Sequence, residues 1–270
     1  RILVAFTAQV AAIEPQFQYS YQAMLDIDVL LAKARLALEL KAFKPAVRTD
    51  NSFSLIRARH PLIDPQKCVP VDIALGKEYD SLIITGPNTG GKTVTLKTIG
   101  LLTLMAECGL HIPADDGSSI AIFETVLADI GDEQSIDDDL STYSSHLLNM
   151  KNMLAGASSA TLVLIDEFGS GTEPVIGGAI AEAILERLLA KGCYGVITTH
   201  YANIKYYASN TEGIANGAMM FDVQHIRPLF RLETGKPGSS FAVEIARKIG
   251  LPEEIIRIAG EKAGSDHINI

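Results

Sequence analysis

The chain has 270 residues, with 23 basic against 32 acidic side chains and a formal net charge of −9. Apolar residues make up 47% and charged residues 20%, which excludes a disordered or collagen-like chain and predicts one large α/β domain or two small ones. The acidic balance argues against strong binding of nucleic-acid phosphates by this chain alone. No apolar run approaches the roughly 18 residues of a membrane span, so we expect no membrane contact. Three widely separated cysteines suggest neither a zinc site nor a disulfide framework and fit a cytoplasmic protein.

The ends of the sequence favour a piece of a longer protein. The chain opens at Arg1 without Met or a secretory leader, and it closes on residues 266–270 without a helix stop signal. A trimmed but complete protein is the alternative.

A long helix is expected first, over residues 14–43. Apolar residues recur there at helical spacing, Ala, Leu, Lys and Glu dominate, and Pro45 marks the end. At 1.5 Å per residue the helix would run roughly 40 Å. It is either a lever that enters the globular body from an upstream region or an ordinary packed helix.

From about residue 50, short β-rich runs alternate with helical segments, which predicts an α/β fold with a mostly parallel sheet flanked by helices. The expected strands are Phe53–Arg57, Val71–Leu75, Ser81–Thr85, Ile120–Phe123, Thr125–Asp129, Thr161–Asp166 and Tyr194–Thr199, followed by a hairpin of Ile214–Val223 and Pro228–Glu233. The expected helices are Lys92 to about Gly109, Ser144–Ala155, Pro174–Lys191 and Ser240–Ile249. The acidic run Glu133–Asp139 is more typical of a solvated loop than of a site.

The strongest motif lies between the strand 81–85 and the following helix. It reads Gly86-Pro87-Asn88-Thr89-Gly90-Gly91-Lys92-Thr93 and matches the phosphate-loop pattern GxxxxGK[ST]. Glycines let the loop turn its N–H groups inward, and the helix N-terminus adds positive potential. Lys92 is expected to reach the β- and γ-phosphates of ATP, and the Thr93 hydroxyl to ligate Mg²⁺.

A second motif ends the apolar strand 161–165 in two carboxylates, Asp166 and Glu167. Asp166 is expected to hold Mg²⁺, directly or through water. Glu167 would face the γ-phosphate and deprotonate the attacking water. On its own this pattern would be only an acidic turn at a strand end, but it accompanies a phosphate loop.

Two further candidate catalytic residues, Ser141 and His200, complete a recognisable order. Ser141 lies in a Ser-rich stretch that looks like a helix N-terminus, and His200 ends the strand 195–199. The order of the motifs is that of ABC-type ATPases: a phosphate loop, a Ser-rich helix start, a strand that ends in Asp-Glu, and a strand that ends in His. In those ATPases two heads dimerise, and each Ser-rich helix faces the γ-phosphate that the partner holds. The transporter signature LSGGQ is missing. Ser141 could instead be a simple helix cap, and His200 a core histidine.

Weaker candidates flank these motifs. Arg59-His60-Pro61 follows a strand and is either functional or a simple turn. Residues 169–172 are either a dimer-contact loop or a flexible linker to the helix that begins at Pro174.

The motifs together resemble the ATPase domain of the MutS family. The matching segments are GPNTGGKT, LVLIDEFGSGTEP, TTHY and RHP, and Ser141-Thr142-Tyr143 is similar to the family's Ser-Thr-aromatic element. Residues 132–136, residues 140–146 and the stretch 237–252 are similar to the bacterial type 2 branch rather than to the mismatch-repair branch. The match covers essentially the whole chain.

The resemblance implies an ABC-type P-loop fold in three parts. Residues 1–45 would end the clamp and lever region, 46–235 would form the ATPase domain, and 236–270 would be a C-terminal helical element that crosses to the partner subunit. It also implies ATP and Mg²⁺ as cofactors, a homodimer through the ATPase heads, and Ser141 contacting nucleotide in trans. Branched DNA and collided ribosomes are the targets it implies, bound outside this chain, where any nuclease-like Smr tail would also lie.

Three alternatives stay open at this point. The chain could belong to a mismatch-repair MutS, it could be a nucleotide-gated scaffold without turnover, or it could be an SMC-like chromosome-organising head. The branch-specific stretches disfavour a mismatch-repair MutS. The complete set of Lys92, Asp166 and Glu167 disfavours a scaffold without turnover, and the missing LSGGQ-like signature disfavours an SMC-like head.

Overall fold

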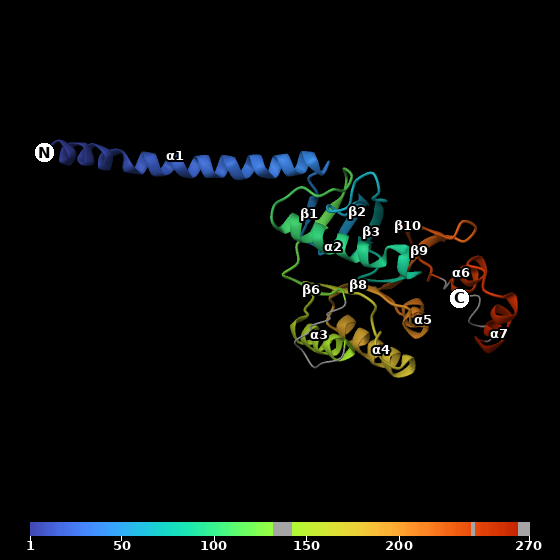
Figure 1. Cartoon of the computed structure of the whole chain (residues 1–270). Coiled ribbons are helices and arrows are strands. Elements are labelled where there is room, and N and C mark those ends of the chain that lie inside the picture. The colour runs from blue at the N-terminus through green and yellow to red at the C-terminus, as the bar shows by residue number, and fades with distance from the viewer. Residues whose placement is uncertain (132–141, 239–240, 264–270) are drawn as a thin grey trace.

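The computed structural model describes residues 1–131, 142–238 and 241–263. Two β-sheets and their helices form the body, and the first helix projects away from it (Figure 1). The helices are α1 (Ile2–Glu39), η1 (Asn88–Gly90, a 3₁₀ turn), α2 (Lys92–Glu107), α3 (Thr142–Gly156), α4 (Pro174–Ala190), α5 (Ala202–Asn210), α6 (Ala242–Lys248) and α7 (Glu253–Ala263). The strands are β1 (Ala46–Arg48), β2 (Phe53–Ala58), β3 (Val71–Leu75), β4 (Ser81–Thr85), β5 (Ser119–Ala121), β6 (Thr125–Asp129), β7 (Thr161–Ile165), β8 (Tyr194–Thr198), β9 (Ile214–Asp222) and β10 (Arg227–Thr234). No helix of this described part is long and apolar enough to cross a membrane.

The larger sheet has six strands in the order β10-β9-β4-β8-β7-β6. All neighbours from β9 to β6 run parallel, and only β10 pairs antiparallel, as the second arm of the expected hairpin. For this sheet the prediction of a mostly parallel arrangement flanked by helices is confirmed.

The prediction of one mostly parallel sheet did not include a second sheet, whose four strands have the order β1-β5-β2-β3. In it β2 pairs antiparallel with both β3 and β5, and β1 runs parallel to β5. The physical reason is the connection between β2 and β3, which holds no helix, and parallel neighbours need a long crossover. The predicted runs 53–57, 71–75 and 120–123 therefore belong to this smaller sheet.

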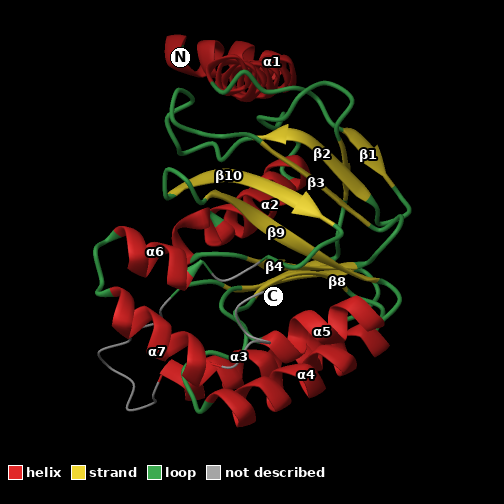
Figure 2. Cartoon of the chain, turned by 90° about the vertical axis from the view of Figure 1, so that its right-hand side faces the viewer, coloured by secondary structure: helices red, strands yellow, loops and turns green. Residues whose placement is uncertain are grey.

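Alternate residues of the central strands feed two separate cores. Leu82 and Ile84 of β4 join the core that contains α2 and the smaller sheet, whereas Ile83 between them joins the core under α3, α4 and α5. Successive side chains of a strand point to opposite faces, so a strand buried on both sides reads as a continuous apolar run. Figure 2 shows the resulting layers, with α3, α4 and α5 below the larger sheet and α2 above it. Both cores pack against β4 and β7, and these strands carry the two sequence motifs to one edge.

Helix α1 is longer and differently placed than the predicted 14–43. It begins at Ile2, continues through Pro15 and ends at Glu39. The C-terminal end is set by Lys41, whose φ of 49° is left-handed, with Ala42 N–H donating to the Ala37 carbonyl at 2.8 Å. This is a Schellman-type stop, so Pro45 does not end the helix.

None of the residues of this wholly described helix is buried, and its base alone is tied to the body. The Lys33 ammonium donates to the Cys108 carbonyl at 2.8 Å, directly after α2. Arg59 donates to the carbonyls of Leu40 and Lys41 at 3.1 and 2.9 Å. Arg59 of the RHP segment therefore stabilises the C-terminal end of α1. Lys33 links α1 to the C-terminal end of α2.

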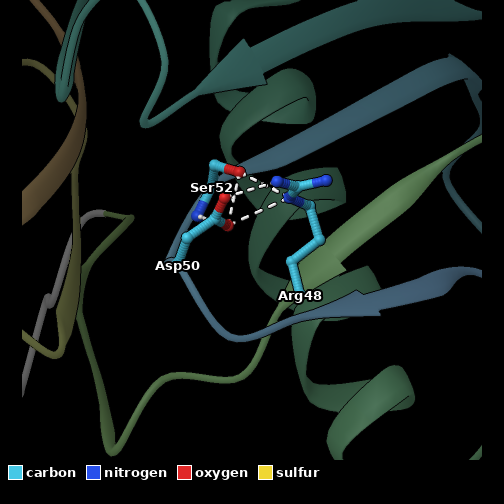
Figure 3. Close-up of polar contacts among 3 residues, drawn as sticks. All are labelled: Arg48, Asp50 and Ser52. Carbon is cyan, nitrogen blue, oxygen red and sulfur yellow. Dashed lines mark hydrogen bonds and ion pairs between the residues drawn. The ribbon is translucent and has the colours of Figure 1, made fainter.

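The turn between β1 and β2 is closed by polar contacts (Figure 3). The Arg48 guanidinium donates to the Asp50 carboxylate and, at 2.7 Å, to the Ser52 hydroxyl, which itself donates to Asp50. These contacts, the Arg48 hydrogen bond foremost, hold the pKa of the Asp50 carboxyl well below its usual range. The turn fixes the start of β2 and lies away from the motif edge.

Candidate functional site

The glycine-rich loop follows β4 and leads into the first turn of α2. Gly86 and Gly91 have φ values of 136° and 93°, which favour glycine. A Cβ on Gly91 would lie 3.1 Å from the ring of Phe230, so the loop is also packed from outside. Gly90 N–H closes the loop by donating to the Pro87 carbonyl at 2.9 Å. The result is a tight loop directly before a helix N-terminus whose first N–H groups lack intrahelical partners.

Lys92 lies inside this loop and is only 2% exposed. Its ammonium donates to the Gly86 carbonyl at 2.7 Å and to Asn88 Oδ1 at 3.2 Å. Burial lowers the pKa of Lys92 to about 8, although the carboxylates of Glu167 and Asp166 oppose this shift. The acceptors that the described residues offer this buried ammonium are neutral, so its positive charge favours an anion in the loop.

His200 lies against the same loop, beyond the end of β8. Its Nε2 is 2.5 Å from Asn88 Oδ1 and 3.1 Å from Lys92 Nζ. Desolvation, followed by the positive charges of Lys92 and Lys205, lowers the pKa of His200. His200 is therefore a polar contact of the loop, and because it is exposed it is not a core histidine.

Asp166 and Glu167 follow β7 and are held by β8. The Thr198 hydroxyl donates to Asp166 Oδ1 at 2.5 Å and accepts from Glu167 N–H at 2.8 Å. Glu167 has a left-handed φ of 48°, unusual for a non-glycine residue, which marks a constrained site. Asp166 is 8% exposed and Glu167 is exposed, so the turn buries the first carboxylate and presents the second.

A pocket of about 210 Å³ connects the two motifs. Thr93 lines it from α2, Asp166 and Glu167 from the end of β7, and Gly131 and His146 from the β6 and α3 side. Sequence reasoning placed Thr93, Asp166 and Glu167 together, and the structure brings them to one pocket. The sequence motifs alone did not indicate a role for His146.

A second pocket of about 230 Å³ lies on the other side of Gly91. It is mostly apolar, with Met219 and Phe230 from the β9–β10 hairpin and His60 and Ile63 from the loop after β2 among its lining residues. Phe230 sits at a register shift of β10 with a φ of 52°. Sequence reasoning missed this pocket, because only the fold brings the hairpin to the glycine-rich loop.

The loop after Glu167 is anchored rather than free. The Tyr201 hydroxyl donates to the Gly169 carbonyl at 2.9 Å, and a Cβ on Gly169 would approach the Tyr201 ring to 2.6 Å. These contacts hold Gly169 against Tyr201 and favour an ordered loop over a flexible linker. Ser141 and the acidic run 133–139 lie outside the described residues, and α3 begins at Thr142, the residue after Ser141.

These features define the class of protein. A buried strand, a glycine-rich loop with an inward lysine, and a helix, beside a strand that ends in Asp-Glu, form an α/β domain of the P-loop ATPase type. The chain belongs to the MutS family, since the sequence profile of MutS domain V matches residues 82–265.

Proteins named endonuclease MutS2 resemble nearly the whole chain. The relative from Carboxydothermus hydrogenoformans is 51% identical, and that from Caldanaerobacter subterraneus subsp. tengcongensis 49%, each over 259 residues that make up 96% of this chain and 33% of the relative. The relative from Lachnospira eligens is 46% identical over 268 residues, 99% of this chain and 34% of its own length. The likeness to the type 2 branch is therefore confirmed, and the chain spans about one third of the length of these relatives.

Proposed function

We propose that this chain binds ATP with Mg²⁺ and hydrolyses it to ADP and phosphate. The observation that carries the proposal is the position of Lys92: a buried ammonium inside a glycine-rich loop, next to a pocket that Thr93, Asp166 and Glu167 share. The phosphates would lie along the loop N–H groups and the N-terminus of α2. The triphosphate charge would restore the full positive charge of Lys92, whose pKa burial lowers.

The donor set of the first pocket fits Mg²⁺. The Thr93 hydroxyl and the Asp166 carboxylate are hard oxygen donors, and one Asp166 oxygen already binds Thr198. Mg²⁺ is usually held by one or two carboxylates together with phosphates and water rather than by an all-protein cage. When bound, it would offset negative charge on the β- and γ-phosphates.

Glu167 is the residue that we propose as the base for the attacking water. Its carboxylate is exposed beside buried Asp166, and its backbone is fixed by Thr198. The water oxygen would bond to the γ-phosphorus as the bond to the ADP oxygen breaks, and the water proton would pass to Glu167.

The pocket behind Gly91 is the place we propose for the nucleobase. It is apolar, it abuts the phosphate loop, and it carries the partly exposed ring of Phe230, 40% accessible. An aromatic ring can stack on the face of any base, so Phe230 is the proposed stacking partner of the nucleobase.

The ATP state would be read out in two directions. The first is a homodimer of heads, in which Ser141 of one subunit completes the site of the other. The second is α1, because Lys33 ties it to the end of the helix that carries Lys92. A movement of the phosphate loop would be transmitted through α2 and would tilt α1. The large apolar side chains of α1 are exposed.

We propose that the target of this motion is branched DNA or a collided ribosome, bound outside the 270 residues of this sequence, which span about one third of the length of the relatives. The relatives are named endonucleases, which supports a nucleic-acid target. The net charge of −9 agrees with contacts that lie outside the chain.

Two variants test the proposal. Lys92→Ala should abolish ATP binding, because the phosphates lose their buried cation. Glu167→Gln should keep binding and lose hydrolysis by about 10²- to 10⁴-fold, because the base acts only on the way to the transition state. Binding of a fluorescent ATP analogue and steady-state phosphate release measure both. Hydrolysis at the wild-type rate by Glu167→Gln would remove Glu167 from its proposed role.

A further inference from the structure

His146 is held by a buried carboxylate at the rim of the first pocket. Its Nδ1 lies 2.7 Å from Asp129 Oδ2, and Asp129 is only 4% exposed. The second oxygen of Asp129 accepts from the Asn149 amide at 2.9 Å. Both carboxylate oxygens are thus used, one of them on the imidazole.

The fold brings this pair to the proposed site of hydrolysis. Asp129 ends β6, and its carbonyl accepts from Asp166 N–H at 2.9 Å, at the end of the neighbouring strand. His146 comes from the first turns of α3 and lines the same pocket as Thr93, Asp166 and Glu167. Two strand ends and one helix therefore fix an imidazole beside the two motif carboxylates.

The pairing also decides which nitrogen can act. Nδ1 of His146 faces a carboxylate oxygen at 2.7 Å, so Nδ1 is the ring nitrogen that is engaged by Asp129 and that donates whenever the carboxylate accepts. Among the residues that the structure describes, the hydrogen bond of the ring is made by Nδ1, so Nε2 is the nitrogen placed to accept from a group in the pocket when the ring is neutral. A carboxylate that orients a histidine in this way fixes both its tautomer and its direction.

The geometry points to His146 as a further residue of the hydrolysis reaction, which accepts a hydrogen bond from the attacking water through Nε2. This inference rests on the proposed function. One water hydrogen would be directed to Glu167 and the other to His146, so that the oxygen lone pair faces the γ-phosphorus. Asp129 is the positioning residue that acts through His146. Two acceptors from different elements would fix the orientation of the water more completely than Glu167 alone.

A matched pair of substitutions separates this role from a structural one. In His146→Asn the amide nitrogen takes the place of Nδ1, so the bond to Asp129 is kept while Nε2 is removed. His146→Gln extends its amide toward the place of Nε2 and restores an acceptor to the pocket. If His146 acts on water, the Asn variant should lose about 10- to 100-fold in kcat with unchanged ATP affinity, and the Gln variant should retain more of the rate.

The control is a second histidine–aspartate pair, with the same contact, in the part of the chain that the structure describes. His225 Nδ1 lies 2.7 Å from Asp222 Oδ2 in the exposed turn between β9 and β10, away from the pocket. His225→Asn should leave kcat unchanged.

The assay is single-turnover ATP hydrolysis by the whole chain, together with binding of a fluorescent ATP analogue. A wild-type rate for His146→Asn would overturn the inference while the wild-type activity upholds the proposed function. Absence of hydrolysis in the wild type, in a dimer-forming length of the protein, would refute the proposed function itself. Should His146→Asn fail to fold, Asp129→Asn replaces it: the new amide would donate to Nδ1, turn Nε2 into a donor and slow hydrolysis by a similar factor. A wild-type rate for Asp129→Asn would likewise contradict the inference.

Discussion

Thr198 is the residue on which the geometry of both motif carboxylates depends. It is fully buried, and its hydroxyl donates to Asp166 at 2.5 Å and accepts from Glu167 N–H at 2.8 Å. Thr198→Val keeps the shape of the side chain and removes both hydrogen bonds. We expect this variant to be destabilised and to hydrolyse ATP slowly.

The magnitude follows from the two bonds. A hydrogen bond to a charged group contributes about 1.5–3 kcal/mol, and an unsatisfied buried N–H costs about 1–3 kcal/mol. Glu167 is exposed, so water can replace part of the second loss, and about 1 kcal/mol is the appropriate share. The free energy of unfolding should therefore fall by about 2.5–4 kcal/mol.

Activity should fall together with stability. The left-handed backbone of Glu167 is fixed by the N–H bond to Thr198, and release of this turn misplaces the proposed base. We expect at least about a 10-fold loss in kcat at a temperature where the variant is still folded. Thr198→Ser keeps the hydroxyl and is the matched control.

Urea denaturation and steady-state hydrolysis of wild type, Thr198→Val and Thr198→Ser test the argument. A Val variant within about 0.5 kcal/mol of wild type, with normal kcat, would show that Asp166 and Glu167 do not depend on this hydroxyl.

Three further predictions concern the nucleotide. Burial lowers the pKa of Lys92 to about 8, whereas the unfolded side chain titrates near 10.5, so the folded state releases its proton first as the pH rises. The stability of the nucleotide-free chain should therefore rise between about pH 8 and 10.5, while its affinity for ATP falls. Thermal melts of wild type and Lys92→Met measure this, and equal pH dependence of the two would show that the ammonium is solvated. Phe230→Ala should weaken ATP binding by about 10-fold, from a stacking loss of about 1–3 kcal/mol, and leave inorganic tripolyphosphate binding unchanged; equal losses for both ligands would place the base elsewhere. A Ser141→Arg subunit mixed with a Lys92→Ala subunit, in a dimer-forming length of the protein, should regain up to about half of the wild-type activity, since one composite site keeps both groups; normal hydrolysis by Ser141→Arg alone would reduce Ser141 to a helix cap.

The sequence predicts the central sheet and the phosphate loop well, because both are local. The apolar runs of β4, β7 and β8 are buried on two faces, and the glycine pattern before Lys92 specifies its loop by backbone geometry. The end of α1 was misplaced because a left-handed Lys41, and not Pro45, stops the helix. Short β1 and the nine-residue, polar α5 carry too little periodicity to be seen.

The remainder of the site depends on contacts that no local pattern encodes. Phe230 reaches Gly91 only because β10 pairs with β9 through a register shift. Thr198 reads as one more strand residue until β8 is placed beside β7. His146 and Asp129 are 17 residues apart, and their pairing requires α3 to pack on the end of β6.

The central claim is that this chain is an ATP-hydrolysing head, and single-turnover hydrolysis with prebound, γ-labelled ATP and Mg²⁺ tests it most directly. The account predicts that wild type releases labelled phosphate and that Glu167→Gln retains intact ATP on the protein. Wild type that binds ATP and releases no phosphate, in a dimer-forming length of the protein, would contradict the claim and leave a nucleotide-gated scaffold.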